Sequence, residues 1–160
     1  MSSRFNSEVH GMRIVLPDLP PAAANPNANS HYFTVSKVRR MQQEEMIAYV
    51  LEQGKPDKPM DKAHITITWR SKDRRTRDID NLLAAMKGSI DGLVTAGVLV
   101  DDSAKHLSYT LFYFYGNGIT ESETIIEIQE VVDEVQVHPD RHCSGCQCRS
   151  VPSDSHYLEG

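Results

Sequence analysis

The stretch Arg70–Asp102 reads RSKDRRTRDIDNLLAAMKGSIDGLVTAGVLVDD, and it decides how the rest of the chain is interpreted. It begins with a cluster of arginine and lysine that runs into an aspartate pair, Asp78 and Asp80. An amphipathic segment follows, and a second pair, Asp101 and Asp102, ends the stretch. Cations beside clustered carboxylates are typical of sites that act on phosphate groups, so the sequence predicts phosphate chemistry here.

The first part of the stretch is strongly basic. Its positive side chains are Arg70, Lys72, Arg74, Arg75 and Arg77. Only Asp73 offsets them locally. Such a run suits contact with a polyanion, because each phosphate contact releases condensed counterions. A solvated loop of mixed charge is the alternative. We predict that these residues contact the phosphate groups of a polyanion, which sets position without reading sequence.

Asp78 and Asp80 are two residues apart, so on an extended backbone both side chains point to the same side. Asp80 is then placed to cap a helix that begins at Asn81. Two carboxylates on one side begin a Mg²⁺ site, since this ion needs a few hard oxygen ligands and keeps water for the rest. In the alternative interpretation, one aspartate caps the helix and the other pairs with an arginine.

A helix is predicted from about residue 80 to residue 97, where a glycine ends it. With about 100° per residue, its core face comprises Leu82, Leu83, Met86, Ile90, Leu93 and Val94. A second strip has no side chain larger than serine and comprises Ala85, Gly88, Ser89, Gly92 and Ala96. Such a strip lets another backbone approach closely, and the sequence leaves open whether that contact lies between subunits or within one.

Asp91 lies on the same side of this helix as Asp80 but about 16 Å further along the axis, too far to share one metal ion. We therefore expect Asp91 to pair with Lys87, four residues earlier. A further metal ligand must come from Asp101 or Asp102, after the chain has turned back.

The pattern D-I-D-N-L-L, then K-G-S-I-D-G-L, then G-V-L-V-D-D resembles the signature of RusA-type Holliday-junction resolvases, small Mg²⁺-dependent endonucleases of phages and prophages. The resemblance is most specific over residues 74–102, and the order of elements fits from about residue 10 to residue 132. It implies a set of catalytic, metal-binding acids: Asp78, Asp80 and Asp102, with Asp101 beside them.

The chain departs from the family at the lysine. Better-known members carry a functional lysine four residues after the second aspartate, where this chain has Ala84. Lys87 keeps the family's spacing to Asp91, as if three residues had been inserted before it. Three residues turn a helix by about 300°, so Lys87 can reach the same groove from one turn further along. We predict that Lys87 is the catalytic lysine.

The resemblance also implies a homodimer that acts on branched DNA, above all four-way junctions, by paired nicks in recombination and repair. Mg²⁺ is the expected cofactor, with Mn²⁺ as a substitute, and no small organic cofactor is expected. A fork- or flap-selective nuclease of the same fold and a junction-binding protein that does not cut are the alternatives. Such a protein would be phage- or prophage-encoded and would act in the cytoplasm of a bacterial host.

The remaining segments predict one α+β domain over residues 1–135, with a mixed sheet of about four strands and two principal helices in the order β-α-β-α-β-β. Alternating apolar residues predict strands at residues 9–16, 63–70 and 124–132, and an apolar, aromatic run predicts a further strand at residues 107–115. Trp69 is expected in the core, although stacking on a nucleobase is the alternative, and Ile126 and Ile128 should point inward. The third strand is apolar on both faces, as in a strand covered on both sides.

A first helix is predicted from about residue 34 to residue 53, after a proline- and asparagine-rich loop at residues 17–30 without regular structure. Its expected buried side chains are Val38, Met41, Ile47, Ala48 and Leu51. Lys37 and Arg40 lie in its first turns and are predicted to contact DNA, with a solvated surface as the alternative.

Residues 136–160 form a tail that the resemblance does not cover. The tail contains all three cysteines, and its candidate zinc ligands are His142, Cys143, Cys146 and Cys148. A Cys-x-x-Cys pair with a third thiol and a histidine can bind Zn²⁺ tetrahedrally. A disordered, redox-exposed tail is the alternative.

The formal net charge of −5 over 160 residues is unusual for a protein that binds DNA. An acidic run lies late in the chain, at residues 121–134, far in sequence from the arginines. A basic face and an acidic face can coexist, because electrostatic steering depends on the local field. No apolar run approaches the about twenty residues of a membrane span, so we expect a soluble protein.

Overall fold

The structure, a computed structural model, describes residues 11–25, 27, 31–116 and 118–132. Its four strands are β1 (Gly11–Pro17), β2 (Ala63–Ser71), β3 (Leu107–Tyr115) and β4 (Glu123–Glu130). They form one sheet in the order β1-β4-β2-β3, in which β2 and β3 are parallel and the other neighbours are antiparallel. The predicted α+β fold with a mixed four-stranded sheet is therefore confirmed.

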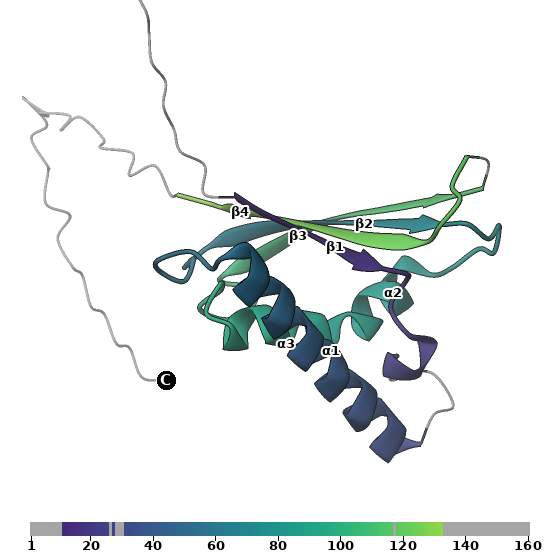
Figure 1. The fold of residues 1–160 in the computed structure, drawn as a ribbon, viewed down its shortest axis with the longest axis horizontal. Helices are drawn as coiled ribbons and strands as arrows, with labels where there is room; N and C mark the ends of the chain where they lie inside the picture. The colour runs from purple at the N-terminus through teal and green to yellow at the C-terminus, as the bar shows by residue number, and fades with distance from the viewer. Residues whose placement is uncertain (1–10, 26, 28–30, 117, 133–160) are drawn as a thin grey trace, which may run out of the picture.

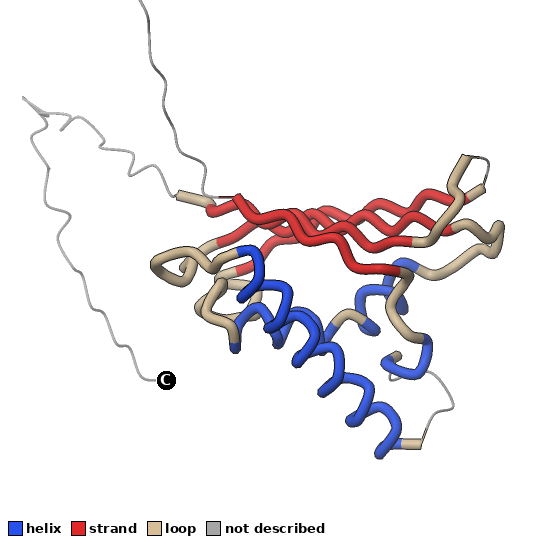
Figure 2. The backbone as a smooth tube through the Cα atoms, in the orientation of Figure 1, coloured by secondary structure: helices blue, strands red, loops and turns tan. Residues whose placement is uncertain are grey.

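The helices cover one side of this sheet. They are α1 (Tyr32–Gln53), α2 (Ile79–Ala85), α3 (Lys87–Thr95) and a 3-10 turn, η1 (Ala22–Ala24). All of them lie below the sheet in the view of Figure 1, and within the described residues no helix lies on the other side (Figure 2). The turn η1 falls in the loop for which no regular structure was predicted, where three successive alanines favour a helical turn.

The sheet buries its helix-facing side. Ile67 and Trp69 of β2 and Ile126 and Ile128 of β4 have no exposed surface, as the alternation in both strands predicts. Trp69 is thus a core residue that cannot stack on a base. From the helix side, the predicted core face is also confirmed: Leu82, Met86, Ile90 and Leu93 are buried, and Leu83 and Val94 pack against them.

Helices α1 and α3 approach each other through the strip of small residues. A Cβ added to Gly88 would lie 2.4 Å from the carbonyl oxygen of Arg39, and one added to Gly92 would lie 2.7 Å from Cβ of Met46. At these distances even an alanine would not fit without movement of its neighbours. Both neighbours belong to α1 of the same chain. The strip is therefore a packing surface within one subunit.

The helix predicted over residues 80–97 is two helices that meet at Met86. The amide of Met86 donates to the carbonyl of Leu83 as in a 3-10 turn. The carbonyl of Ala85 accepts a hydrogen bond of 2.9 Å from the side-chain amide of Gln42. A side chain of α1 thus takes the carbonyl that a continuous helix would bond internally, so the break depends on tertiary contacts.

The buried face of α1 corrects the prediction. The expected core residues that are exposed are Met41, Ala48 and Leu51, and those that are only partly buried are Val38 and Ile47. Instead, α1 buries Gln42, Met46 and Val50. The position of α3 selects this face, because its glycines admit the α1 backbone and the Ala85 carbonyl provides a partner for Gln42. The pattern of apolar residues along α1 therefore does not by itself identify the face that this helix buries.

Strand β3 is an edge strand, and only its inward face is covered. Tyr109, Leu111 and Tyr113 pack against the core. On the outward face, Phe112 and Phe114 are 45% and 53% exposed, so the prediction of a strand covered on both sides is wrong for a single chain. The reason is topological, since all the described helices lie on the opposite side of the sheet.

Among the described residues, no helix combines the length and hydropathy that crossing a bilayer requires. The tail predicted at residues 136–160 lies outside the described residues, and so does the zinc site predicted at His142, Cys143, Cys146 and Cys148.

Candidate functional site

Lys87 joins two of the predicted carboxylates. It is the first residue of α3, and its Nζ donates to Asp91 Oδ1 at 2.7 Å and also to Asp102 Oδ2. The pair with Asp91 confirms the expectation from their spacing. Asp102 comes from the segment before β3, so the fold brings the second and third parts of the quoted stretch together at one lysine.

This cluster favours the protonated form of Lys87. Partial burial lowers the pKa of Lys87, but hydrogen bonds to Asp102 and Asp91 outweigh burial and leave the pKa above its ordinary value. Tyr109 of β3 lies close to the same charges. Burial, followed by the negative charge of Asp102, raises the pKa of the Tyr109 hydroxyl. At neutral pH the lysine is therefore charged and the tyrosine keeps its proton.

Asp101 and Asp102 have different environments. Gly97, at a φ of +80°, turns the chain after α3 and sends it back toward the cluster. Asp102 reaches Lys87, whereas Asp101 is exposed. A hydrogen bond from the hydroxyl of Ser103, followed by one from the amide of Asp102, lowers the pKa of Asp101. Asp102 is therefore the residue of this pair that belongs to the lysine cluster.

Asp78 and Asp80 lie at the start of α2. The helix begins at Ile79, so Asp78 is its N-cap residue, and the prediction that Asp80 caps a helix from Asn81 is wrong. Asp78 keeps extended dihedral angles (φ −77°, ψ 126°), and the helix begins directly after it. Asp80 is exposed in the first turn, where its charge suits the positive end of the helix dipole.

Two asparagines link Asp78 to the proline- and asparagine-rich loop. Asn81 Nδ2 donates to Asp78 Oδ2 at 3.3 Å, and Asn27 Nδ2 donates to Asn81 Oδ1 at 3.1 Å. A cavity of about 220 Å³ lies at this junction, and Arg77 and Asp78 are part of its lining. The loop before α1 is therefore in contact with the start of α2.

The described residues contain no group of three or more histidine, cysteine, aspartate or glutamate side chains that could hold a metal ion. The ammonium group of Lys87 occupies one side of Asp102, and Asp78 accepts a hydrogen bond from a neighbouring asparagine. A Mg²⁺ site made of Asp78, Asp80 and Asp102, with Asp101 beside them, does not fit the side chains as they are arranged within one chain.

Asp73 organises the basic loop between β2 and α2. Its Oδ1 accepts hydrogen bonds from the amide of Arg75 and the hydroxyl of Ser71, both at 3.1 Å, and its Oδ2 accepts one from Arg77 at 3.0 Å. The amide of Arg75 contributes most to a pKa of Asp73 below its ordinary value. The loop is therefore a hydrogen-bonded turn in which Arg77 is folded onto Asp73.

The other residues of the basic cluster differ in how exposed they are. Arg70 pairs with Glu123 on the neighbouring strand at 2.5 Å. The exposed basic side chains of the loop between β2 and α2 are Lys72, Arg74 and Arg75. The loop is also braced from β3, because the hydroxyl of Tyr113 donates to the carbonyl of Arg75 at 3.0 Å. The exposed part of the cluster is therefore presented on a fixed turn.

The basic residues of α1 lie toward the same end of the molecule. Arg40 pairs with Glu44 at 3.0 Å, and Lys37 is exposed. The start of α1 and the loop between β2 and α2 both lie on the right in Figure 1. A polyanion at this end could meet both segments, as the sequence predicts for DNA.

Sequence reasoning missed two residues near these sites. Tyr109 was assigned only to an apolar strand, and Asn81 only to the start of a helix. The signal for Tyr109 is weak, because its closeness to Asp102 and Lys87 is a feature of the tertiary structure. Asn81 directly follows the aspartate pair, and an asparagine three residues after Asp78 is well placed to hydrogen-bond with it.

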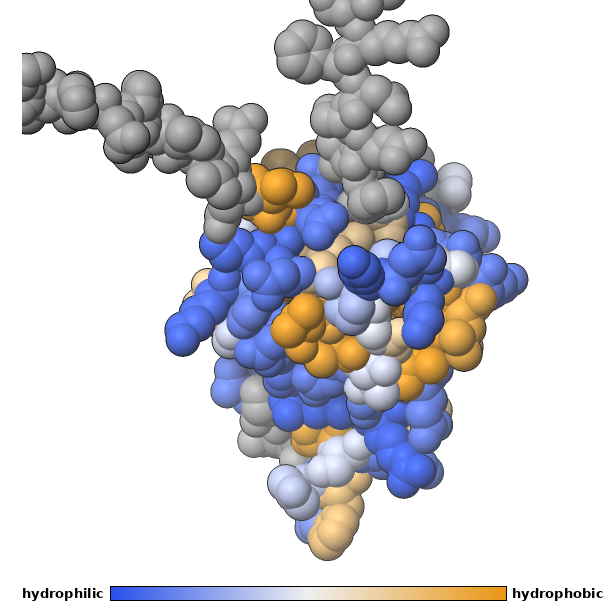
Figure 3. Space-filling view, turned by 90° about the vertical axis from the view of Figure 1, so that its left-hand side faces the viewer, coloured by the Kyte–Doolittle hydropathy of each residue, from blue (hydrophilic) through white to orange (hydrophobic). Residues whose placement is uncertain are grey.

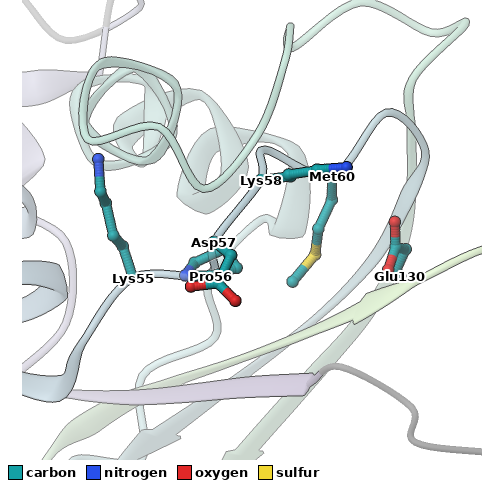
Figure 4. A pocket seen from close by; sticks show the side chains of 6 residues that line it. All are labelled: Lys55, Pro56, Asp57, Lys58, Met60 and Glu130. Atoms are coloured by element: carbon teal, nitrogen blue, oxygen red, sulfur yellow. The ribbon is translucent and has the colours of Figure 1, made fainter.

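A separate cavity of about 460 Å³ lies between the loop after α1 and the end of β4 (Figure 4). Its lining is Lys55, Pro56, Asp57, Lys58, Met60 and Glu130. It lies at the end of the molecule where β1 begins and β4 ends, which presents a largely hydrophilic surface with smaller hydrophobic patches (Figure 3). Because its lining mixes both charge signs and includes no predicted site residue, we do not assign it to the site.

No protein-family model matches the chain, and no curated protein matches it.

Proposed function

We propose that the protein is a structure-selective endonuclease that cleaves branched DNA, above all four-way junctions. The observation that carries this proposal is Lys87, held between Asp91 and Asp102 with 46% of its side chain exposed. A protonated lysine fixed in this way is a preoriented positive charge. It would stabilise the negative charge that develops on a phosphate during attack, at little cost in reorganisation.

The surrounding residues would have supporting roles. Asp91 and Asp102 would keep Lys87 charged and oriented, and Tyr109, which keeps its proton, would be a neutral hydrogen-bond donor beside them. The exposed residues of the basic loop would bind the DNA backbone on either side of the cleavage point. The proposal includes a homodimer, because two sites related by a two-fold axis suit paired nicks in a near-symmetric junction.

Mg²⁺ is part of the proposal as the cofactor that the resemblance to RusA-type resolvases implies, with Mn²⁺ as a substitute. The acids that would bind it are Asp78, Asp80, Asp101 and Asp102. Because they are not gathered into one group within the described chain, we assign no step of the reaction to the metal. By the same resemblance, the enzyme would act in the cytoplasm of a bacterial host.

A junction-binding protein that does not cut is the second candidate, and one observation favours it. Two of the three predicted catalytic acids already have partners, since Lys87 binds Asp102 and Asn81 binds Asp78. In that case the carboxylates would be structural, and the basic loop would carry the function.

Cleavage of a labelled four-way junction, compared with linear duplex, fork and flap, separates these candidates. Each substrate is incubated with Mg²⁺, Mn²⁺ or EDTA and with the unaltered protein, Asp80→Asn or Asp57→Asn. Asp57 is the matched control, because it is also an exposed aspartate and lies in the separate 460 Å³ cavity. We expect paired, metal-dependent nicks in the junction that vanish in Asp80→Asn and persist in Asp57→Asn.

Binding is measured in parallel by gel shift in EDTA, and Asp80→Asn should still bind the junction. Tight binding without cleavage under either metal would refute the nuclease and support the binding protein. Faster cleavage of forks or flaps than of junctions would keep the nuclease and change its substrate.

A further inference from the structure

The sheet has one face that no described helix covers, and this face carries exposed apolar side chains on both of its edge strands. The exposed fractions of Val15, Phe112 and Phe114 on this face are 41%, 45% and 53%. The rings of Phe112 and Phe114 are stacked, with 6.2 Å between their centroids. Exposed apolar side chains that gather on one face of a protein mark an interaction site, so this face is typical of one with a partner.

The strand register arranges the outward side chains in rows that cross the sheet in the order β1, β4, β2, β3. The first row is Pro17, Glu123, Arg70 and Phe114. The second row is Val15, Ile125, Thr68 and Phe112. The third row is Arg13, Glu127, Thr66 and Thr110. A largely apolar row is therefore flanked on both sides by a row that contains one arginine and one glutamate.

We propose that the homodimer, which belongs to the proposed function, forms through this open face: it binds the same face of a second copy of the chain, about a two-fold axis that runs along the strands between β4 and β2. With this axis, each row lies opposite the same row of the second copy, and the order of the strands is reversed. Glu123 then lies opposite Arg70 of the second copy, and Val15 lies opposite Phe112 of the second copy. The face is self-complementary in both charge and apolar character, as an isologous interface requires.

The register also disfavours the other simple arrangement. In that arrangement the two-fold axis runs across the strands, through the second row. The first row of one copy would then lie opposite the third row of the second copy. Glu123 would then lie opposite Glu127 of the second copy, and like charges brought together in an interface are repulsive. Aligned sheets pack within about 30° of each other, so residues beside the axis keep their partners while those at the edges shift.

The charge of the face points to a second copy and away from a nucleic acid. Arg70 pairs with Glu123 at 2.5 Å, and Arg13 pairs with Glu127 at 3.6 Å, so the positive charges are already balanced within the face. A polyanion binds surfaces with an excess of positive charge. A balanced face, in contrast, has no net repulsion against its own copy.

The area is sufficient for a specific contact. Four strands about 4.8 Å apart, each with about eight residues that rise about 3.3 Å, cover about 500 Å² per copy. Two copies would together bury about 1,000 Å², the lower bound for a biological interface. The exposed phenylalanines would enlarge this area and are the kind of aromatic anchors that dominate interface energetics.

Sedimentation equilibrium of the full chain, without DNA or metal, tests the proposal independently of any nuclease activity. We expect a dimer for the unaltered protein. Phe112→Glu should raise the dimer dissociation constant at least about tenfold, because it buries a charge within the apolar row of the interface. Leu51→Glu is the matched control, since Leu51 is 67% exposed on α1, away from the open face, and this variant should remain dimeric.

Charge exchange tests the direction of the axis. Arg70→Glu should weaken the dimer, because it opposes Glu123 of the second copy, and adding Glu123→Arg in the same chain should restore it. Arg13→Glu is the control, since it also breaks a pair within the face but faces Thr110 of the second copy. Circular dichroism and thermal melts verify that each variant is folded.

Three results would overturn the proposal. A monomeric unaltered protein would show that the face has no second copy. A dimer that resists both Phe112→Glu and Arg70→Glu would show that another surface associates. A monomer whose DNA affinity falls in Phe112→Glu would reassign the face to stacking of nucleobases.

Discussion

At the scale of single residues, Asp73 shows how one carboxylate can give form to a run of like charges. It accepts hydrogen bonds from the amide of Arg75, the hydroxyl of Ser71 and the guanidinium of Arg77. Without such an acceptor, the arginines of the loop would repel one another and remain disordered. The aspartate that offsets the basic run in the sequence is therefore the centre of the loop.

We expect Asp73→Asn to destabilise the folded protein at neutral pH, because the charge-assisted hydrogen bonds of the loop weaken. The pKa of Asp73 is lowered below 3.8 in the folded protein, so its stabilisation is present above that value and is lost as the pH falls through the lowered pKa. Urea unfolding midpoints of the unaltered protein and the variant should differ at neutral pH and converge in acid. A difference that persists unchanged in acid would contradict this role.

Lys87 is the second residue that carries a prediction. Lys87→Met leaves Asp91 and Asp102 as neighbouring like charges, which we expect to cost about 1 kcal/mol of stability after solvent screening. The pKa of Lys87 is raised above 10.5, so its stabilisation is present at neutral pH and is lost only as the pH rises through the raised pKa. Urea unfolding at low and high salt measures the loss of stability in Lys87→Met, and Lys105→Met, at an exposed lysine, is the control. Equal losses in both variants would disprove the pairing.

At the scale of elements, the contact between α1 and α3 determines which residues each helix buries. The glycines of α3 let the α1 backbone come close, and Gln42 of α1 binds the carbonyl at the break between α2 and α3. These two features fix the rotation of α1, whose apolar residues at other positions stay exposed. The contact also sets where α3 begins, and so where Lys87 stands.

We expect Gly88→Ala to destabilise the protein by about 1–3 kcal/mol. The added Cβ would meet the carbonyl oxygen of Arg39 at 2.4 Å, and this clash outweighs the about 1 kcal/mol that alanine gains in helix propensity. Chemical denaturation measures the loss. Ala48→Gly on the exposed side of α1 gives the size of the propensity difference alone. A Gly88→Ala variant as stable as the unaltered protein would contradict the close packing.

At the scale of the whole molecule, the net charge of −5 hides an uneven distribution. The loop between β2 and α2 and the start of α1 present basic residues at one end, whereas the open sheet face pairs its charges internally. DNA bound at the basic end would leave the open face free for a second copy. DNA binding and association with a second copy would therefore use different surfaces and can be tested separately.

We expect DNA binding to weaken steeply with salt, and Arg75→Ala to lower the slope of log affinity against log salt concentration by about 0.9. The loss should be similar for different DNA sequences, since a phosphate contact carries no sequence information. Lys58→Ala is the control, because Lys58 lines the 460 Å³ cavity away from the basic loop. Fluorescence anisotropy over a range of salt concentrations measures both slopes, and equal slopes for Arg75→Ala and the unaltered protein would refute the contact.

The sequence by itself determined the features that depend on local periodicity. Alternation located β1, β2 and β4 and placed Trp69, Ile126 and Ile128 inward, an apolar run located β3, and the helical period identified the core face that includes Leu93. The spacing of four residues also predicted the pair between Lys87 and Asp91. These features follow from the geometry of one strand or one helix, so a short stretch is enough to predict them.

Only the tertiary structure decided the features that depend on contacts between distant segments. The break at Met86 and the buried face of α1 follow from the fit between α1 and α3, and the meeting of Lys87 with Asp102 follows from the return of the chain toward β3. The open face of the sheet follows from the strand order and from helices on one side only. The physical reason is that burial, unlike periodicity, is a property of the neighbours that the fold supplies.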